Sequence, residues 1–360
     1  MIMKEKFKIL FPIDGDMLNF KDGNIIDGCL ITKIKIYSLQ ECRIIVNGET
    51  ANFIDGVYIA NVILKKYRNT IEVVDELSGQ KDTITVYYLK NYTDKYRLSL
   101  DDNIWFLKDI ASNADKYKSI FDNQYLGFLR KVNREFGTKI HINIYYQDNG
   151  FNLSYMPDKY KNEWKENSNW LRLSFHALQD KPDKPYIHAG YVEIKRDCEL
   201  VIDQIRRFAG EELIGPVTTL HWGEATVEGC RALRDAGYKC QVGDFNVDNE
   251  LPPVSYYLDV DKRRHINSRF IWKDNIENII FFRSSIIIDC HRLDEITDFL
   301  DKIYEDPVKS GFIDLLIHEQ YFYPAYFNYQ ADYRQKIMTS VKWAVSKGYK
   351  PAFLSDCIFK

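Results

Sequence analysis

Two patterns of hydrophobic and polar positions divide the chain. Between residues 7 and 89, short runs alternate apolar and polar residues, and Gly, Asn and Asp separate them. The runs are CLITKIKIY, CRIIVNG, GVYIANVIL, NTIEVVDEL and DTITVYYL. Because successive side chains of a strand point to opposite faces, this alternation predicts antiparallel strands. Several such strands in a short segment predict an N-terminal all-β sandwich domain over residues 1–92.

Beyond residue 91, apolar runs alternate with segments of helical periodicity. KYKSIFDNQYLGFLRKVNREFG has helical spacing and ends at Gly137, and TKIHINIYYQ follows as a strand. Later strands are WLRLSFHA, VTTLHWG, SSIIIDCHRL and FIDLLIHEQ, each followed by a helical segment, and PAFLSDCIF is predicted to end the chain as a strand. Strands that alternate with helices are typical of parallel sheets and barrels, and about seven units are present. We therefore predict an α/β fold, a distorted (β/α)7-like barrel, over residues 93–360.

Composition excludes some classes of partner. The 360 residues carry a formal net charge of −3 with scattered Lys and Arg, which argues against a nucleic-acid partner. The N-terminal MIMKEKFKILFPIDGD has too short an apolar run for a secretion signal or a membrane span. Seven Cys without a C-x-x-C pair favour a cytoplasmic location, with secretion after signal removal as the alternative. No oligomeric state is predicted.

Aromatic residues make up 14% of the chain, and many of its 25 Tyr lie near predicted loops. The apolar face of a sugar ring packs on an aromatic ring while its hydroxyl groups bind polar side chains. This distribution favours a carbohydrate substrate. Packing of Tyr into a partly hydrated core is the alternative.

Carboxylate and imidazole groups recur where the predicted barrel strands end. They are Asp101 and Asp102, His176, His221 with Trp222 and Glu224, and His318 with Glu319. In a parallel barrel, the C-terminal ends of the strands meet at one mouth, where the chemistry of such enzymes takes place. We therefore expect these side chains to form one site.

The adjacent carboxylates Asp101 and Asp102 favour a divalent cation. Neighbouring strand residues point to different sides, so one carboxylate can face a cation and the other a substrate water. A cation also offsets the repulsion between two like charges. Bound by Asp102 and His176, it would polarise an ester or amide carbonyl while Asp101 takes a proton. We expect zinc, and cobalt, nickel or manganese are alternatives. The alternative role for the two carboxylates is to cap the following helix or turn.

Residues 95–355 resemble the polysaccharide deacetylase family of carbohydrate esterases. SLDDN is similar to the first family motif, TFDDG, and LLIH at 315–318 is similar to its last motif, Leu-x-His. The resemblance implies a divalent metal, with Asp101 as general base, Asp102 as metal ligand and His318 as general acid. The N-terminal residues resemble bacterial immunoglobulin-like modules.

Two other family motifs are altered in this chain. HWGEATVEGCRALRDAGYK is similar to a third motif, with His221 where Arg is usual. The family's His-x-x-x-His pair of metal ligands is reduced to His176 followed by Asp180 in SFHALQDK. Asp180, His188 and His318 are then the candidates for a third ligand, and we predict His188.

The remaining rim residues are predicted to bind substrate: His221, Trp222, Glu224 and Glu319. A plug in the barrel mouth is the alternative for Trp222, and a helix N-terminal charge is the alternative for Glu224. The predicted function is a metal-dependent, deacetylase-like hydrolase that acts on an acyl group of a sugar or polysaccharide. A catalytically inactive carbohydrate-binding relative and a metal-independent glycoside hydrolase with two rim carboxylates are the alternatives.

Overall fold

The computed structural model describes residues 7–38, 42–247 and 254–360, which form two compact units. The first unit contains the chain up to Thr93 together with the segment Ile271–Asn278, and the second contains Asp94–Phe270 and Ile279–Phe359. Residues 1–6, where the sequence predicts neither a signal nor a span, lie outside the described residues. The domain boundary between residues 92 and 93 stays a prediction.

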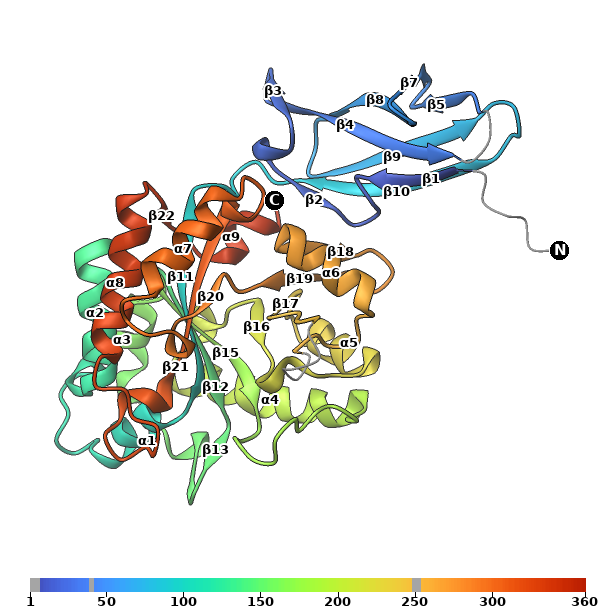
Figure 1. The fold of residues 1–360 in the computed structure, drawn as a ribbon. Coiled ribbons are helices and arrows are strands. Elements are labelled where there is room, and N and C mark those ends of the chain that lie inside the picture. The colour runs from blue at the N-terminus through green and yellow to red at the C-terminus, as the bar shows by residue number, and fades with distance from the viewer. Residues whose placement is uncertain (1–6, 39–41, 248–253) are drawn as a thin grey trace. The chain divides into compact units, whose positions relative to one another are not determined.

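The alternating runs of the first unit form two five-stranded sheets (Figure 1). One has the order β1-β4-β8-β7 with β3 added to β4, and the other has the order β2-β10-β9-β5-β6. The strands are β1 (Phe7–Phe11), β2 (Met17–Leu18), β3 (Asn24–Ile26), β4 (Cys29–Ser38), β5 (Ile44–Val46), β6 (Glu49–Thr50), β7 (Asn52–Ile54), β8 (Val57–Leu64), β9 (Arg68–Asp75) and β10 (Lys81–Tyr88). Buried side chains of both sheets, among them Ile34, Ile71 and Val86, form one hydrophobic cluster.

The segment Ile271–Asn278, which includes β18 (Ile271–Asp274), belongs to the first unit although it comes late in the sequence. Trp272 forms a bridge with Asp16, and its indole N–H donates to the carbonyl of Asp14 at 2.8 Å. Gly15 has a φ of +87°, and a Cβ there would lie 1.9 Å from the carbonyl oxygen of Lys273. Only glycine fits this close approach of two backbones.

The second unit contains parallel sheets. One sheet has the order β15-β12-β11-β21-β20, with β22 also paired to β11, and another sheet contains β16-β17-β19. The strands are β11 (Lys95–Asn103), β12 (Ile140–Tyr145), β15 (Leu171–Ala177), β16 (Val217–Thr219), β17 (Cys240–Gly243), β19 (Ile279–Arg283), β20 (Ile286–Ile287), β21 (Phe312–His318) and β22 (Lys350–Pro351). The fold is therefore mixed α/β, and the described strands do not close into one barrel.

Helices lie around these strands (Figure 1). They are α1 (Trp105–Ser112), α2 (Gln124–Phe136), α3 (Lys161–Glu166), α4 (Tyr191–Phe208), α5 (Val227–Asp235), α6 (Val260–Arg269), α7 (Ile296–Glu305), α8 (Tyr333–Ser346) and α9 (Leu354–Ile358). Helix α2 ends at Gly137, as its spacing predicts, because Gly137 takes a left-handed φ of 70°. In the described residues no helix combines the length and apolar character needed to cross a bilayer.

The prediction of a closing strand at PAFLSDCIF is wrong. Only Lys350–Pro351 form a strand, and Leu354–Ile358 form helix α9. Leu354, Cys357 and Ile358 are the buried residues of α9. Their spacing of three and four residues places them on one face of a helix, which a strand cannot do.

Candidate metal centre

The ends of four parallel strands supply polar residues to one cavity of about 620 Å³. Asp101 of β11 lies opposite His318 of β21 in the strand register. His176 comes from β15, and His221 begins the short helix η6 (His221–Gly223) that follows β16. The four residues line the cavity, together with Asp102 and aromatic side chains. The ends of these four strands therefore meet at one cavity, although the strands belong to two sheets.

An unusual backbone conformation at Asp102 separates the two adjacent carboxylates. Asp102 has a φ of 61°, and the pairing of β11 with β12 shifts register between Leu100 and Asn103. A positive φ is uncommon at a non-glycine residue, although Asp and Asn adopt it more readily than most. The Asp101 carboxylate accepts a hydrogen bond from Asn143 at 2.7 Å, whereas Asp102 contacts two imidazoles.

Three donor atoms lie close together around Asp102. Its Oδ1 is 2.9 Å from His176 Nε2 and 3.0 Å from His221 Nδ1. The two imidazole nitrogens are 3.2 Å apart. A zinc-like cation binds imidazole nitrogen and carboxylate oxygen at about 2.0–2.2 Å, so one cation can reach all three atoms. The donor set thus fits a divalent metal.

Each imidazole is oriented by a backbone carbonyl on its other side. His176 Nδ1–H donates to the carbonyl of Thr219 at 2.5 Å, and His221 Nε2–H donates to that of Asp180 at 3.1 Å. When both rings are neutral, as metal binding requires, this arrangement leaves the remaining nitrogen of each ring able to bind a cation. Metal-binding histidines almost always have such a partner, because it fixes the tautomer and the ring position.

Two further side chains hold the Asp102 carboxylate. The Tyr145 hydroxyl donates to Oδ1 at 2.5 Å and lies 3.0 Å from His221 Nδ1. Gln320 Nε2 donates to Oδ2 at 2.7 Å. Sequence analysis missed both residues, although Tyr145 ends β12 and the same strand-end rule selects it.

Burial and neighbouring charges act in opposite directions on the donor groups. Burial raises the pKa of Asp102, but hydrogen bonds from His176 and His221 outweigh this effect and hold the pKa well below its usual value. Burial lowers the pKa of His176, and the nearby Asp102 and Asp101 carboxylates reverse the shift and raise it. Burial also raises the pKa of Asp101, against the opposing charges of His176 and His318.

His318 belongs to a separate pair. Its Nδ1–H lies 3.0 Å and 3.1 Å from the two oxygens of Asp289, and its backbone N–H donates to Asp289 Oδ1 at 3.0 Å. Burial lowers the pKa of His318, but the Asp289 charge more than compensates and the pKa rises to about 10. The imidazole is therefore protonated at neutral pH. Sequence analysis did not select Asp289, because it lies in a short loop helix, η7 (Ile288–Cys290).

The loop after β15 carries the other two predicted third ligands, and neither joins the donor group. His188 is exposed and lies outside the group. The Asp180 side chain is 54% exposed, and it is the Asp180 backbone carbonyl that accepts from His221. The group instead contains His221, predicted as a substrate-binding residue, because the chain returns to the cavity only at the end of β16.

The remaining predicted substrate-binding residues differ in position. Trp222 lines the cavity, has a φ of 65°, and keeps a buried indole N–H without a hydrogen-bond partner in the described chain. Glu224 is buried outside the cavity lining and lies 3.8 Å from Lys184. Burial raises the pKa of Glu224, and Lys184 opposes that effect.

Glu319 is fully buried and faces the start of α1, not the cavity. Its carboxylate accepts hydrogen bonds from the backbone N–H groups of Ile104, Trp105 and Phe106 at 2.6–2.9 Å. Burial raises its pKa to about 7 although these hydrogen bonds favour the charged form. Glu319 therefore caps the start of helix α1.

Comparisons with known proteins give distant similarities only. No family model matches the chain. No curated protein matches it in sequence. Among solved structures, the chain is similar to a 4-α-glucanotransferase from Thermococcus litoralis, at 13% identity and a TM-score of 0.46, over 74% of this chain and 40% of that one.

Two further solved structures are carbohydrate-related. A pseudoenzyme of the CE4 family from Bacillus anthracis has 9% identity and a TM-score of 0.36, over 80% of this chain and 83% of its own. The carbohydrate deacetylase Agd3 has 7% identity and a TM-score of 0.37, over 88% of this chain and 62% of its own. Likeness at this level assigns neither an activity nor a residue role to this chain.

Proposed function

We propose that the second unit is a metal-dependent hydrolase of the carbohydrate deacetylase type, with Asp102, His176 and His221 as the metal ligands. The observation that supports this most strongly is the close set of three donor atoms, 2.9–3.2 Å apart, whose imidazoles both donate their other N–H to a backbone carbonyl. Zinc is the first choice for one carboxylate and two imidazoles. In this proposal His221 takes the place of His188.

A divalent cation held here would polarise an acyl carbonyl and make a water more acidic. Asp101 lies beside the donor group with its carboxylate in the cavity, where it can accept a proton as general base. His318 faces the same cavity from the neighbouring strand, and because Asp289 holds its Nδ1–H, Nε2–H is free to protonate a leaving group. Base and acid then act from two adjacent strands.

The cavity also suits a sugar. Trp222, Tyr321, Tyr326 and Phe327 contribute aromatic surface, and Phe327 is 83% exposed. Such rings can pack on the apolar face of a pyranose.

We further propose that the parallel sheets are an opened form of the predicted (β/α)7 barrel and that the first unit is an immunoglobulin-like sandwich.

Metal analysis of purified variants tests the ligand set. We expect the wild-type protein to bind about one equivalent of zinc and Asp102→Ala, His176→Ala and His221→Ala to lose it, since removal of metal-site residues commonly lowers affinity by at least 10- to 100-fold. His188→Ala is the matched control and should bind like the wild type. Metal loss in His188→Ala with retention in His221→Ala would contradict the proposed ligands.

Acetate release from acetylated chitooligosaccharides tests the activity. Asp101→Asn and His318→Ala should keep the metal and lose about 10²- to 10⁴-fold in turnover, because each removes one proton-transfer group. A wild-type protein that binds metal and the oligosaccharide but releases no acetate would support the inactive carbohydrate-binding alternative. The glycoside hydrolase alternative has less support, because Glu224 does not line the cavity with Asp102.

A further inference from the structure

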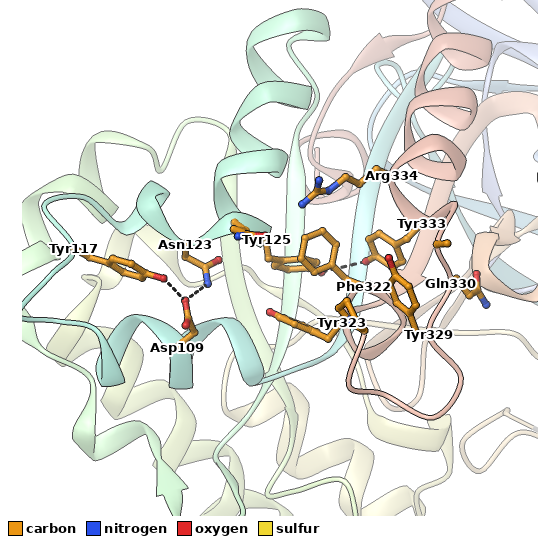
Figure 2. Close-up of a pocket in the computed structure, with 13 residues that line it drawn as sticks. Asp109, Tyr117, Asn123, Tyr125, Phe322, Tyr323, Tyr329, Gln330, Tyr333 and Arg334 are labelled. Carbon is orange, nitrogen blue, oxygen red and sulfur yellow. Dashed lines mark hydrogen bonds between the residues drawn. The ribbon is translucent and has the colours of Figure 1, made fainter.

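A second cavity of about 450 Å³ lies in the same unit, and its lining residues come from the two segments 109–125 and 322–334. The cavity of about 620 Å³ at the candidate metal centre is called the metal cavity below. The second cavity shares no lining residue with it. Figure 2 shows Asp109, Tyr117 and Asn123 at one end and Tyr329 and Gln330 toward the other. The volume is within the range of small-ligand sites.

The aromatic walls of this cavity are held in place by hydrogen bonds. The Tyr117 hydroxyl donates to Asp109 at 2.8 Å and the Tyr323 hydroxyl donates to Glu319 at 2.8 Å. Behind them, Tyr125 packs edge-on against Phe322 with ring centroids 5.1 Å apart. Tyr329 remains 42% exposed at the surface. Rings fixed in this way offer stacking surfaces at little cost in side-chain entropy.

The two charged groups of the cavity, Asp109 and Arg334, differ in their hydrogen-bond partners. The Asp109 carboxylate already accepts from three side chains, Tyr117, Asn123 and Asn113, at 2.7–3.0 Å. The Arg334 guanidinium, by contrast, contacts only rings among the described residues, 4.9 Å from Phe322 and 5.7 Å from Phe128. Figure 2 shows Arg334 reaching over the aromatic side chains. The available charge is therefore positive.

We infer that this cavity is a second carbohydrate site, specific for a sugar ring that carries a carboxylate. Tyr329 and the neighbouring rings would stack on the sugar, and the planar Arg334 guanidinium would bind its carboxylate through two parallel hydrogen bonds. The inference does not depend on the metal proposal, because the walls and the charge belong to the second cavity alone.

The two cavities share one segment of chain. Gln320, Tyr321, Tyr326 and Phe327 line the metal cavity, while Phe322, Tyr323, Pro324 and Tyr329 line the second cavity. A ligand in the second site therefore contacts the same loop that forms part of the metal cavity. The position suits a site that holds an acidic sugar of a polysaccharide close to the reaction centre.

Saturation-transfer NMR titrations with methyl β-D-glucuronide and the neutral methyl β-D-glucoside test the inference. The titrations use the full wild-type chain, and variants of Arg334 and Tyr329 assign the binding to the second cavity. We expect the glucuronide to bind at least about tenfold more tightly than the glucoside, the value of one charge-assisted contact. Arg334→Gln should remove this difference, and Tyr329→Ala should weaken both sugars.

Matched variants separate local from general effects. Arg130→Gln removes another guanidinium that stacks on a ring, 4.1 Å from Phe121, but lies outside the cavity, and Tyr155→Ala removes an exposed Tyr elsewhere. Both should bind like the parent protein. Equal binding of the two sugars, or binding unchanged in Arg334→Gln and Tyr329→Ala, would overturn the inference and leave the metal proposal untouched.

Discussion

At the residue scale, the left-handed conformation of Asp102 is central to the candidate site. It turns one of two adjacent carboxylates toward His176 and His221 while Asp101 keeps its strand register with His318. A regular strand would also place the two side chains on opposite faces, but the positive φ and the register shift add a local bend. Two carboxylates can then serve one cavity in different roles.

The Asp289 charge controls the protonation of His318, and this leads to a residue-scale prediction. In metal-free protein, Asp289→Asn should lower the pKa of His318 from about 10 by about 1 to 3 pH units, the usual effect of a close opposite charge. The raised pKa also contributes stability that is complete below the unfolded value of 6.5 and is lost as pH rises toward about 10. NMR titration of the His318 ring measures the change.

Asp294→Asn is the matched control for this titration, because Asp294 pairs with Arg292 on the exposed surface nearby. Its His318 ring should titrate as in the wild type. A His318 pKa unchanged in Asp289→Asn would show that another group sets the charge of the imidazole.

Sequence alone named some of the residues that line the metal cavity, and its choice of third ligand, His188, lies outside the donor group. Asp101, Asp102, His176 and His318 follow from the rule that strand ends meet. The third donor could not be read from spacing, because it depends on how residues 178–189 leave the sheet and expose His188. His221 follows β16 and lies 45 residues beyond His176 in the sequence, and only the folded chain brings the two imidazoles within 3.2 Å.

At the element scale, helix α1 begins without a cap from its own segment. Ile104 at the N-cap position makes no side-chain hydrogen bond, and Glu319 supplies the acceptor from after β21. We predict that Glu319→Ala lowers the free energy of unfolding by about 3 kcal/mol, because three backbone N–H groups, two buried and one partly buried, lose their acceptor. Urea denaturation followed by circular dichroism measures the loss.

Tyr323→Phe provides the comparison for Glu319→Ala, since it removes only one of the hydrogen bonds to the carboxylate. It should cost about 1 kcal/mol. If Glu319→Ala costs no more than Tyr323→Phe, water replaces the carboxylate at the start of α1 and Glu319 is not the main cap.

The long elements were predictable and the short ones were not. Helices α2, α4, α5, α7 and α8 lie where apolar spacing places them, because each buries one continuous face. The segment after Pro351 is so short that its apolar residues fit both the helical and the strand period. It forms helix α9, which buries one face. Whether the sheets close into a barrel depends on the pairing of strands that are distant in sequence. The local spacing of hydrophobic residues does not predict that pairing.

At the scale of the whole molecule, the second unit buries groups that respond to acid. His141 is 3% exposed and bonds Ser174 at 2.8 Å. Burial, together with the positive charges of Arg97 and Arg172, holds its pKa well below 6.5. Since the unfolded chain takes up this proton first, stability should fall below pH 6.5 by about 1.4 kcal/mol per pH unit from this group.

His141→Gln should therefore flatten the fall in stability between pH 6.5 and pH 5 by about 2 kcal/mol. Urea midpoints at each pH measure the slope, and His188→Gln, at an exposed position, is the control. Equal slopes in His141→Gln and the wild type would contradict a contribution of His141 to the acid sensitivity.

The late segment Ile271–Asn278 also sets an order of events during synthesis. The first unit needs Trp272 beside Asp14 and Asp16, yet Trp272 is translated long after Thr93. At about 5–20 residues per second, that interval is roughly 10–40 seconds. The N-terminal strands therefore leave the ribosome without one of their partners, and their native packing is complete only when most of the second unit has already been made.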